Sequence, residues 1–242
     1  MKAFLLAAGL GTRLRPLTLT TPKCLVPING KPLLQWWIEL FNQHGIHEVM
    51  INTFYLREQV AEFIDRNNNS SSGVTLHEIH EQTLAGSGGT VRNNRHFVEN
   101  DDSFIIAYAD NLTDTNLSDF MSFHENTCVP DGGVLSMALF HTNLPKQCGI
   151  AELDSSSRIT AFTEKPEHPK SNLANAGIYI ARHEIFNYLP ECEVLDFGKD
   201  VLPKLIGKMY GWHDRNYLID IGTHENYQKA QTEWRQLKND NH

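Results

Sequence analysis

Glycines, small residues and two cations lie close together near the start of the chain, in a pattern suited to binding an anion. The strand-like run 2–7 leads into a loop containing Gly9 and Gly11, which let a backbone approach a ligand closely. Exposed N–H groups in such a loop can cradle a phosphate. Arg13 places one cation inside the loop, and Lys23 places another ten residues later. The pattern predicts a site for a phosphorylated ligand.

The loop departs from two common phosphate-binding patterns. A dinucleotide-binding loop requires G-x-G-x-x-G, but here the third glycine position holds Leu14, and Pro16 follows. A P-loop requires G-x-x-x-x-G-K-[ST], and no Gly-Lys pair in this sequence is followed by serine or threonine. Two glycines alone describe a tight turn equally well, so the interpretation depends on the motifs around them.

Two aspartates follow strand-like segments in other parts of the chain. Asp110 ends the run 104–110, and Asp220 lies in the run 217–222. Mg²⁺ is typically bound by one or two carboxylates, with phosphate oxygens and water as its other ligands. Each aspartate taken alone is equally well an ordinary residue of the turn after a strand. As a pair they are candidate metal ligands.

Apolar runs alternate with helical patterns through the first part of the chain. The predicted strands cover residues 2–7, 47–53, 74–79 and 103–109. Helices are predicted over 32–45 and 57–67 and after Gly89. This alternation predicts a mostly parallel sheet with helices on both of its faces.

The pattern changes after residue 130, where strand-like runs follow one another with few helical patterns between them. Strands are predicted over 132–140, 149–153, 158–164 and 175–181, and helices return over 197–206 and 225–238. These runs predict a smaller antiparallel extension of the parallel sheet. No linker divides the chain, so we expect one α/β domain over residues 1–242.

Composition excludes several classes of protein. The 242 residues are 40% hydrophobic and 21% charged, which is typical of a soluble globular chain and not of a disordered one. No apolar run approaches the ~18 residues that a membrane helix needs. The net charge of −8 disfavours a nonspecific nucleic-acid binder, although five cations precede the first acid, Glu39. The four cysteines lie far apart, which argues against a zinc ribbon and favours the cytoplasm.

A longer string around the first loop is more specific than the loop itself. Residues 6–34, LAAGLGTRLRPLTLTTPKCLVPINGKPLL, resemble the signature of the sugar-1-phosphate nucleotidylyltransferases, or NDP-sugar pyrophosphorylases. The resemblance extends over roughly residues 1–231. It implies a Rossmann-like, mixed and mostly parallel sheet flanked by helices, the GT-A-like nucleotidyltransferase fold, with a small antiparallel extension. It further implies a stand-alone enzyme, with nucleotide bound by about 1–130 and sugar phosphate by about 131–235.

The resemblance also implies roles for individual residues. Arg13 and Lys23 would hold the triphosphate, and Asp110 and Asp220 would bind Mg²⁺; these four would be the catalytic residues. The implied nucleotide-binding residues are Leu6, Ala8, Gly9, Gly11, Thr12, Arg13, Lys23, Gln82, Gly86, Ser87 and Gly88. The implied sugar-phosphate-binding residues are Gly149, Glu164, Lys165 and Asn175.

Some positions depart from the usual pattern of the family. Ala109 precedes Asp110 where glycine is common, and residues 84–88 read LAGSG where L-G-T-A-G is usual. Cys148 replaces a common tyrosine. Glu81 and Gln82 both lie where a side chain would reach the edge of the base, and the sequence does not choose between them.

The implied reaction condenses a sugar 1-phosphate with a nucleoside triphosphate to give an NDP-sugar and pyrophosphate. The strings DIGT-x-E-N-Y and DFGKDVLP most resemble mannose- or heptose-1-phosphate guanylyltransferases, which favours GTP. UTP- and dTTP-dependent enzymes share the same core and are the first alternative. A noncatalytic sugar-nucleotide-binding protein and an NAD-binding oxidoreductase are more distant alternatives. Neither nucleic acid nor a membrane is an expected partner, and a homo-oligomer is left open.

Overall fold

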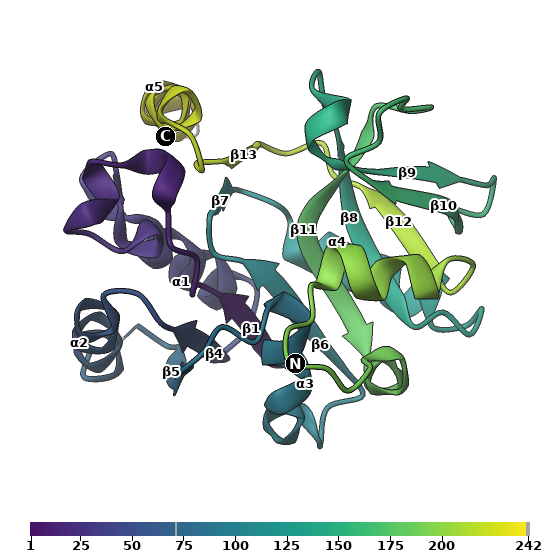
Figure 1. Ribbon diagram of the computed structural model, residues 1–242, viewed down its shortest axis with the longest axis horizontal. Helices are drawn as coiled ribbons and strands as arrows, with labels where there is room; N and C mark the ends of the chain where they lie inside the picture. Colours follow the sequence, from purple (N-terminus) through teal and green to yellow (C-terminus); the bar gives the residue numbers. More distant parts are fainter. Residues whose placement is uncertain (71, 241–242) are drawn as a thin grey trace. The chain divides into compact units, whose positions relative to one another are not determined.

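The computed structural model describes residues 1–70 and 72–240, which form two compact units (Figure 1). The first unit contains Met1–Phe4, Leu84–Ala107 and Thr115–Arg215. The second contains Leu5–Thr83, Tyr108–Asp114 and the chain from Asn216 onward. Each unit therefore combines segments that are distant in sequence. The expected single domain, with its parts on either side of residue 130, stays a prediction.

The parallel strands of the second unit follow the order β1-β4-β5. Only the last two residues of β1 belong to this unit. Their bounds are Ala3–Leu6 for β1, Glu48–Thr53 for β4 and Thr75–His80 for β5. Helix α2 (Arg57–Asn68) connects β4 to β5 and packs on both strands, which pair in parallel (Figure 1). This arrangement is the strand–helix–strand unit that the alternating pattern predicts.

The rest of the second unit surrounds a buried apolar cluster that includes Leu14, Val26, Leu112, Ile221 and Trp234. Each such side chain contributes roughly 1.5–3 kcal/mol when fully buried. The cluster joins segments from both ends of the sequence. The elements around it are β2 (Pro27–Ile28), β3 (Lys31–Pro32), α1 (Leu33–Gln43), β7 (Asn111–Thr113), β13 (Leu218–Asp220) and α5 (His224–Asp240).

The first unit contains strands in the order β10-β9-β11-β6-β1, in which the neighbours from β10 to β6 pair antiparallel. Strand β11 also pairs antiparallel with β8, and β12 runs parallel to β8. Antiparallel strands are therefore confirmed after residue 130. The bounds are β6 (Ser103–Tyr108), β8 (Leu135–His141), β9 (Gly149–Leu153), β10 (Ile159–Glu164), β11 (Leu173–Arg182) and β12 (Met209–His213).

Two helical segments of the first unit differ from the prediction. Helix α3 (Ser87–Asn93) begins before Gly89, because Gly86 adopts a backbone conformation open to glycine (φ 79°, ψ 161°) and ends the loop earlier. The predicted helix over 197–206 is instead a π-helical turn at Phe197–Val201 followed by a 3₁₀ turn at Leu202–Leu205. Pro203 explains the break, since proline has no N–H to continue an α-helix.

Helix α4 (Leu117–Phe123) was not predicted from the apolar pattern. Its start is marked by Asn116, whose side-chain oxygen accepts a hydrogen bond from the Asp119 N–H at 3.2 Å. Such an N-cap stabilises a helix by ~1 kcal/mol. Among the described residues, no helix combines the length and apolar character that crossing a bilayer demands.

Candidate functional site

The four predicted catalytic residues meet in the second unit around the nearly buried ammonium group of Lys23, a residue that is 7% exposed. Lys23 Nζ donates to Asp110 Oδ2 at 2.5 Å and to Asp220 Oδ1 at 3.3 Å. The Arg13 guanidinium lies 3.8 Å from the other oxygen of Asp220. Folding therefore joins two cations and two carboxylates from widely separated segments in one cluster, which we call the Lys23 cluster.

Tight turns place the two cations. Gly11 has a φ of +62°, and the Thr18 hydroxyl donates to its carbonyl at 2.6 Å. A Cβ atom at Gly11 would lie 2.9 Å from Thr18 Cγ2, so this position requires glycine. The 3₁₀ turn Thr12–Leu14 follows and carries Arg13, whose side chain is 66% exposed. Lys23 begins a second 3₁₀ turn, which starts after Pro22.

The two aspartates are brought together by the pairing of short strands. Asp110 lies in the turn between β6 and β7, and Asp220 is the last residue of β13. Strands β7 and β13 pair antiparallel, with Asp220 opposite Asn111. The Ile221 N–H donates to the Asp110 carbonyl at 3.0 Å, which extends this pairing beyond the strands. The carboxylates therefore depend on β-pairing for their mutual placement.

Gly222 and Asn226, which follow Asp220 in the sequence, also belong to this site, although neither was predicted to do so. The Gly222 N–H donates to Asp220 Oδ1 at 2.7 Å, and Asn226 Nδ2 donates to the Asp220 carbonyl at 2.8 Å. A Cβ atom at Gly222 would lie 2.7 Å from the Arg13 guanidinium and 3.0 Å from Lys23 Nζ. A larger side chain at this position would have to displace the ends of Arg13 and Lys23. The string DIGT-x-E-N contains both residues and was the signal available for finding them.

The pair of aspartates has the chemistry that Mg²⁺ requires. Hard carboxylate oxygens of Asp110 and Asp220 converge within 3.3 Å of one nitrogen atom, so one cation can contact both groups. In the part of the chain that the structure describes, no set of three or more His, Cys, Asp or Glu side chains could hold a metal ion. A magnesium ion at this pair would therefore take its remaining ligands from phosphate oxygens or water.

The other predicted nucleotide-binding residues of the second unit lie at the ends of β1 and β5. Leu6 ends β1, Ala8 is 8% exposed, and a Cβ atom at Gly9 would meet no atom within 4 Å. Thr12 begins the turn that carries Arg13. Gln82 is exposed after β5, whereas the neighbouring Glu81 is buried and its carboxylate accepts a hydrogen bond from Asn52.

The second glycine-rich loop lies in the first unit and is held by the segment 195–197. The N–H groups of Gly88 and Gly89 both donate to the Leu195 carbonyl, at 2.9 and 3.2 Å. The Ser87 hydroxyl accepts from the Phe197 N–H at 2.8 Å. Gly86 has a φ of +79°, and a Cβ atom there would overlap the Leu195 carbonyl oxygen. The loop therefore needs glycine at this position for steric and conformational reasons together.

We expect Gly86→Ala to lower the midpoint of urea unfolding much more than Gly207→Ala does. Gly207 has a similar φ of +81° but has no atom within 4 Å of an added Cβ, so it isolates the strain of a positive φ. That strain costs about 1 kcal/mol, and the added overlap with Leu195 should raise the loss at Gly86 to about 3 kcal/mol. Equal losses in the two variants would show that the contact with Leu195 is unimportant.

The predicted sugar-phosphate residues gather around β9, β10 and β11 in the first unit. Gly149 lies opposite Glu164 in the β9–β10 pairing, and a Cβ atom there would be 2.6 Å from a Glu164 carboxylate oxygen. Burial raises the pKa of Glu164, an effect opposed by the charge of Lys165 and reinforced by that of Asp196. Glu164 is therefore protonated at a higher pH than an ordinary glutamate.

Lys165 and Asn175 complete this group. Lys165 is exposed, has a φ of +47°, and donates its backbone N–H to the Cys148 carbonyl at 3.0 Å. Asn175 donates to the Tyr179 hydroxyl at 2.7 Å and accepts from the Gly177 N–H at 2.9 Å. Ala174 pairs with Ile150, which brings Asn175 next to the start of β9. The structure thus places all four residues in one region of the first unit.

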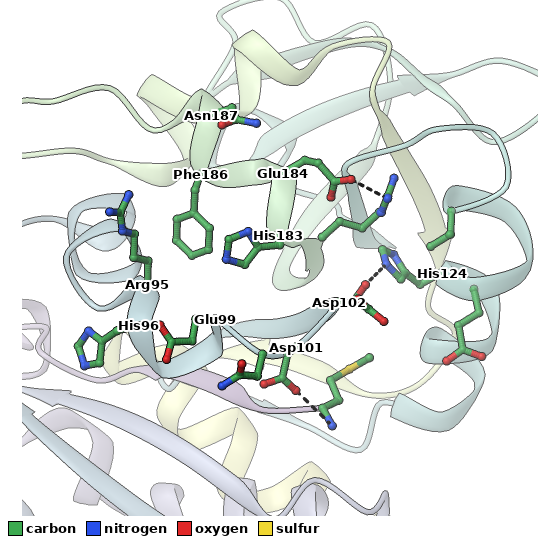
Figure 2. Close-up of a pocket in the computed structure, with 16 residues that line it drawn as sticks. Arg95, His96, Glu99, Asp101, Asp102, His124, His183, Glu184, Phe186 and Asn187 are labelled. Atoms are coloured by element: carbon green, nitrogen blue, oxygen red, sulfur yellow. Dashed lines mark hydrogen bonds and ion pairs between the residues drawn. The ribbon is translucent and has the colours of Figure 1, made fainter.

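A cavity of about 1440 Å³ opens elsewhere in the first unit and contains none of the predicted site residues (Figure 2). Many of its charged groups pair with each other: Arg182 contacts Glu184 at 2.6 Å, and the N-terminus contacts Asp101 at 3.7 Å. His124 hydrogen-bonds two serine hydroxyls there, and burial, aided by Arg182, lowers its pKa to about 4. Volume alone therefore does not identify the reacting site of this chain.

Comparisons with known proteins find similar sequences over most of the chain. A family model described as Nucleotidyl transferase matches residues 2–236. UTP–glucose-1-phosphate uridylyltransferase of Synechocystis sp. is 31% identical over 95% of this chain, which spans only 62% of that relative's length. D-glycero-alpha-D-manno-heptose 1-phosphate guanylyltransferase of Aneurinibacillus thermoaerophilus is 31% identical over 96% of this chain and 98% of its own.

A solved structure has the same fold as this chain. The solved structure of a UDP-glucose pyrophosphorylase complexed with UDP-glucose matches this chain with a TM-score of 0.81. The match covers 97% of this chain and 98% of the other, at 21% sequence identity, and confirms the expected GT-A-like α/β fold. The family model covers nearly the whole sequence, and the relatives carry names of sugar-1-phosphate nucleotidylyltransferases. The chain therefore belongs to the nucleotidyl transferase family.

Proposed function

We propose that this chain transfers a nucleotidyl group to a sugar 1-phosphate, giving an NDP-sugar and pyrophosphate. The observation that carries the proposal is the Lys23 cluster, in which an almost buried ammonium lies between Asp110 and Asp220 beside Arg13. The reaction brings several negatively charged phosphates together, so its catalyst needs cations and a metal site in one place. This cluster joins two cations to a pair of carboxylates that could hold a metal ion.

Each member of the cluster has a role in the proposal. Arg13 binds the β- and γ-phosphates and neutralises the leaving pyrophosphate, and Lys23 binds the α-phosphate and stabilises the charge that develops there. Asp110 and Asp220 would hold Mg²⁺, which supplies positive charge against the converging phosphates. An oxygen of the sugar phosphate attacks the α-phosphorus as the bond to pyrophosphate breaks. That oxygen is already ionised, so the chain needs no general base.

In the first unit, we propose further contacts with the substrates. Glu164 and Lys165 would bind the sugar and its phosphate, with Gly149 and Asn175 beside them. Gly86, Ser87 and Gly88 would contact the nucleotide. Catalysis then consists mainly of positioning and electrostatic stabilisation, as is typical of phosphoryl-transfer enzymes.

For the substrates, we propose GTP with a mannose- or heptose-type 1-phosphate. The relative that this chain matches over 98% of its length is named a heptose 1-phosphate guanylyltransferase, which supports this choice. The relative named a uridylyltransferase supports the alternative of UTP. We also propose a cytoplasmic location, in keeping with four cysteines that are all free thiols.

Pyrophosphate release tests the proposal directly. The purified chain is incubated with each of GTP, ATP, UTP and dTTP, together with mannose, heptose or glucose 1-phosphate. We expect release with GTP and a mannose- or heptose-type substrate, and its loss when EDTA removes Mg²⁺. Faster release with UTP or dTTP would contradict the proposed GTP specificity but would still support the proposed reaction. Binding of an NDP-sugar without any release would favour a noncatalytic role.

A further inference from the structure

The peptide that begins the first loop is hydrogen-bonded on both of its sides. The N–H of the peptide between Leu6 and Ala7 donates to the side-chain oxygen of Asn52 at 2.7 Å. The carbonyl of the same peptide accepts from the Ala109 N–H at 3.0 Å. The partner of the Ala7 N–H is a side chain, whereas the partner of the Leu6 carbonyl is backbone. A substitution can therefore remove only the hydrogen bond to Asn52.

Asn52 is held in the orientation that this contact requires. Asn52 lies in β4 and is 5% exposed, and its Nδ2 donates to Glu81 Oε1 at 2.9 Å. Glu81 is 9% exposed and follows β5, where its own N–H donates to the Thr53 carbonyl at 2.9 Å. The Glu81 carboxylate oxygen accepts this hydrogen bond, so the NH₂ side of the Asn52 amide faces Glu81. The amide oxygen of Asn52 then faces Ala7.

The same peptide is linked to the Lys23 cluster. Ala109, which donates to the Leu6 carbonyl, directly precedes Asp110. The Asp110 carbonyl accepts in turn from Ile221, the residue after Asp220. Backbone hydrogen bonds therefore connect the start of the first loop, through Ala109 and Ile221, to the segments that carry both aspartates. Asn52 and Glu81 hold this peptide from the opposite side.

We propose that Asn52 and Glu81 are positioning residues, which fix the first loop relative to the aspartates so that it receives the triphosphate in the reactive geometry. This inference rests on the proposed function. Glu81 acts through Asn52 and Asn52 acts through the loop backbone, so neither touches substrate. Of Glu81 and Gln82, Gln82 would then be the residue that contacts the nucleobase. A displacement of about 1 Å at a reacting group can cost about a hundredfold in rate, so holding this peptide matters.

Exchanging the two side-chain types provides the test. In Asn52→Asp the new carboxylate faces Glu81, and we expect kcat/KM for the triphosphate to fall by about ten- to a hundredfold. In Glu81→Gln the new amide oxygen can still accept from Asn52, so we expect a loss of about threefold or less. The double variant Asn52→Asp/Glu81→Gln restores one donor and one acceptor, and we expect it to regain activity within about fivefold of the unchanged protein.

Asn68→Asp is a matched control in the same unit. Like Asn52, Asn68 uses both ends of its amide: it donates to the Leu76 carbonyl at 2.9 Å and accepts from the Leu76 N–H at 2.8 Å. We expect this variant to lower the melting temperature but to leave KM for the triphosphate unchanged. A double variant as impaired as Asn52→Asp, or equal kinetic losses in Asn68→Asp, would overturn the proposal.

A second measurement separates this proposal from the proposed function. Hydrogen exchange of the Ala7 amide, measured by NMR, requires no turnover. We expect Asn52→Ala to speed this exchange by about tenfold or more, because the amide loses its acceptor. If the unchanged protein releases no pyrophosphate, the proposed function fails, whereas unchanged exchange at Ala7 would refute the positioning role alone.

Discussion

Replacing Lys23 with methionine should reduce pyrophosphate release by about a hundred- to a thousandfold, the usual loss when one charge-stabilising donor is removed from a reacting site. Methionine fills a similar space, so the packing around this 7% exposed residue is largely kept. The lost group is the ammonium that contacts Asp110 at 2.5 Å and Asp220 at 3.3 Å. The variant therefore removes charge at the α-phosphate while the loop retains its backbone.

Folding should survive this change. The side chains of Asp110 and Asp220 are 39% and 46% exposed, so water can solvate the carboxylates that lose their partner. Because the carboxylates stay solvated and methionine fills the place of Lys23, we expect the melting temperature to fall by a few degrees at most. Thermal unfolding monitored by circular dichroism checks this.

Lys31→Met is the matched control for this prediction. Lys31 belongs to the same unit and contacts Glu39 at 2.7 Å, but its ammonium lies over the Trp36 ring and away from the cluster. We expect its turnover to match that of the unchanged protein. Turnover of Lys23→Met within about threefold of that of Lys31→Met would exclude the role assigned to Lys23.

Local sequence patterns predicted well those elements whose structure depends on the spacing of apolar residues or of glycines. A continuous apolar run placed β4 and a helical period placed α2 within a residue or two, because β4 is buried on both of its faces and α2 on one. Glycines and cations located the first loop. The sequence could not show that Lys23 lies between the two aspartates, since that depends on the pairing of β7 with β13.

Features that depend on distant contacts were missed for the same reason. Asn52 is visible in the sequence as a polar residue within an apolar strand, but its partners Ala7 and Glu81 depend on how β1, β4 and β5 align. Gly86 is visible as a loop glycine, but its steric requirement arises from the carbonyl of Leu195, more than a hundred residues away. Patterns therefore identify which residues are unusual, and the fold identifies what they contact.

Replacing Asp110 with asparagine should have an effect of comparable size, about a thousandfold on turnover, but with a different signature. The asparagine amide keeps an oxygen that can bind a metal ion and has nearly the same shape, but it lacks the negative charge that attracts Mg²⁺. We expect the Mg²⁺ concentration for half-maximal turnover to rise, and excess Mg²⁺ to recover part of the activity. Pyrophosphate release measured over a range of Mg²⁺ concentrations checks this. Asp220→Asn should behave in the same way.

The contrast between these variants distinguishes the roles of the cations and the carboxylates. Asp65→Asn, an exposed position on α2 in the same unit, controls for the loss of one negative charge and should leave the Mg²⁺ dependence unchanged. Lys23→Met should lower turnover at every Mg²⁺ concentration, because the missing ammonium contacts phosphate directly in our proposal. If Asp110→Asn also loses activity uniformly at all Mg²⁺ concentrations, then Asp110 acts by holding Lys23 in place, and the metal belongs elsewhere.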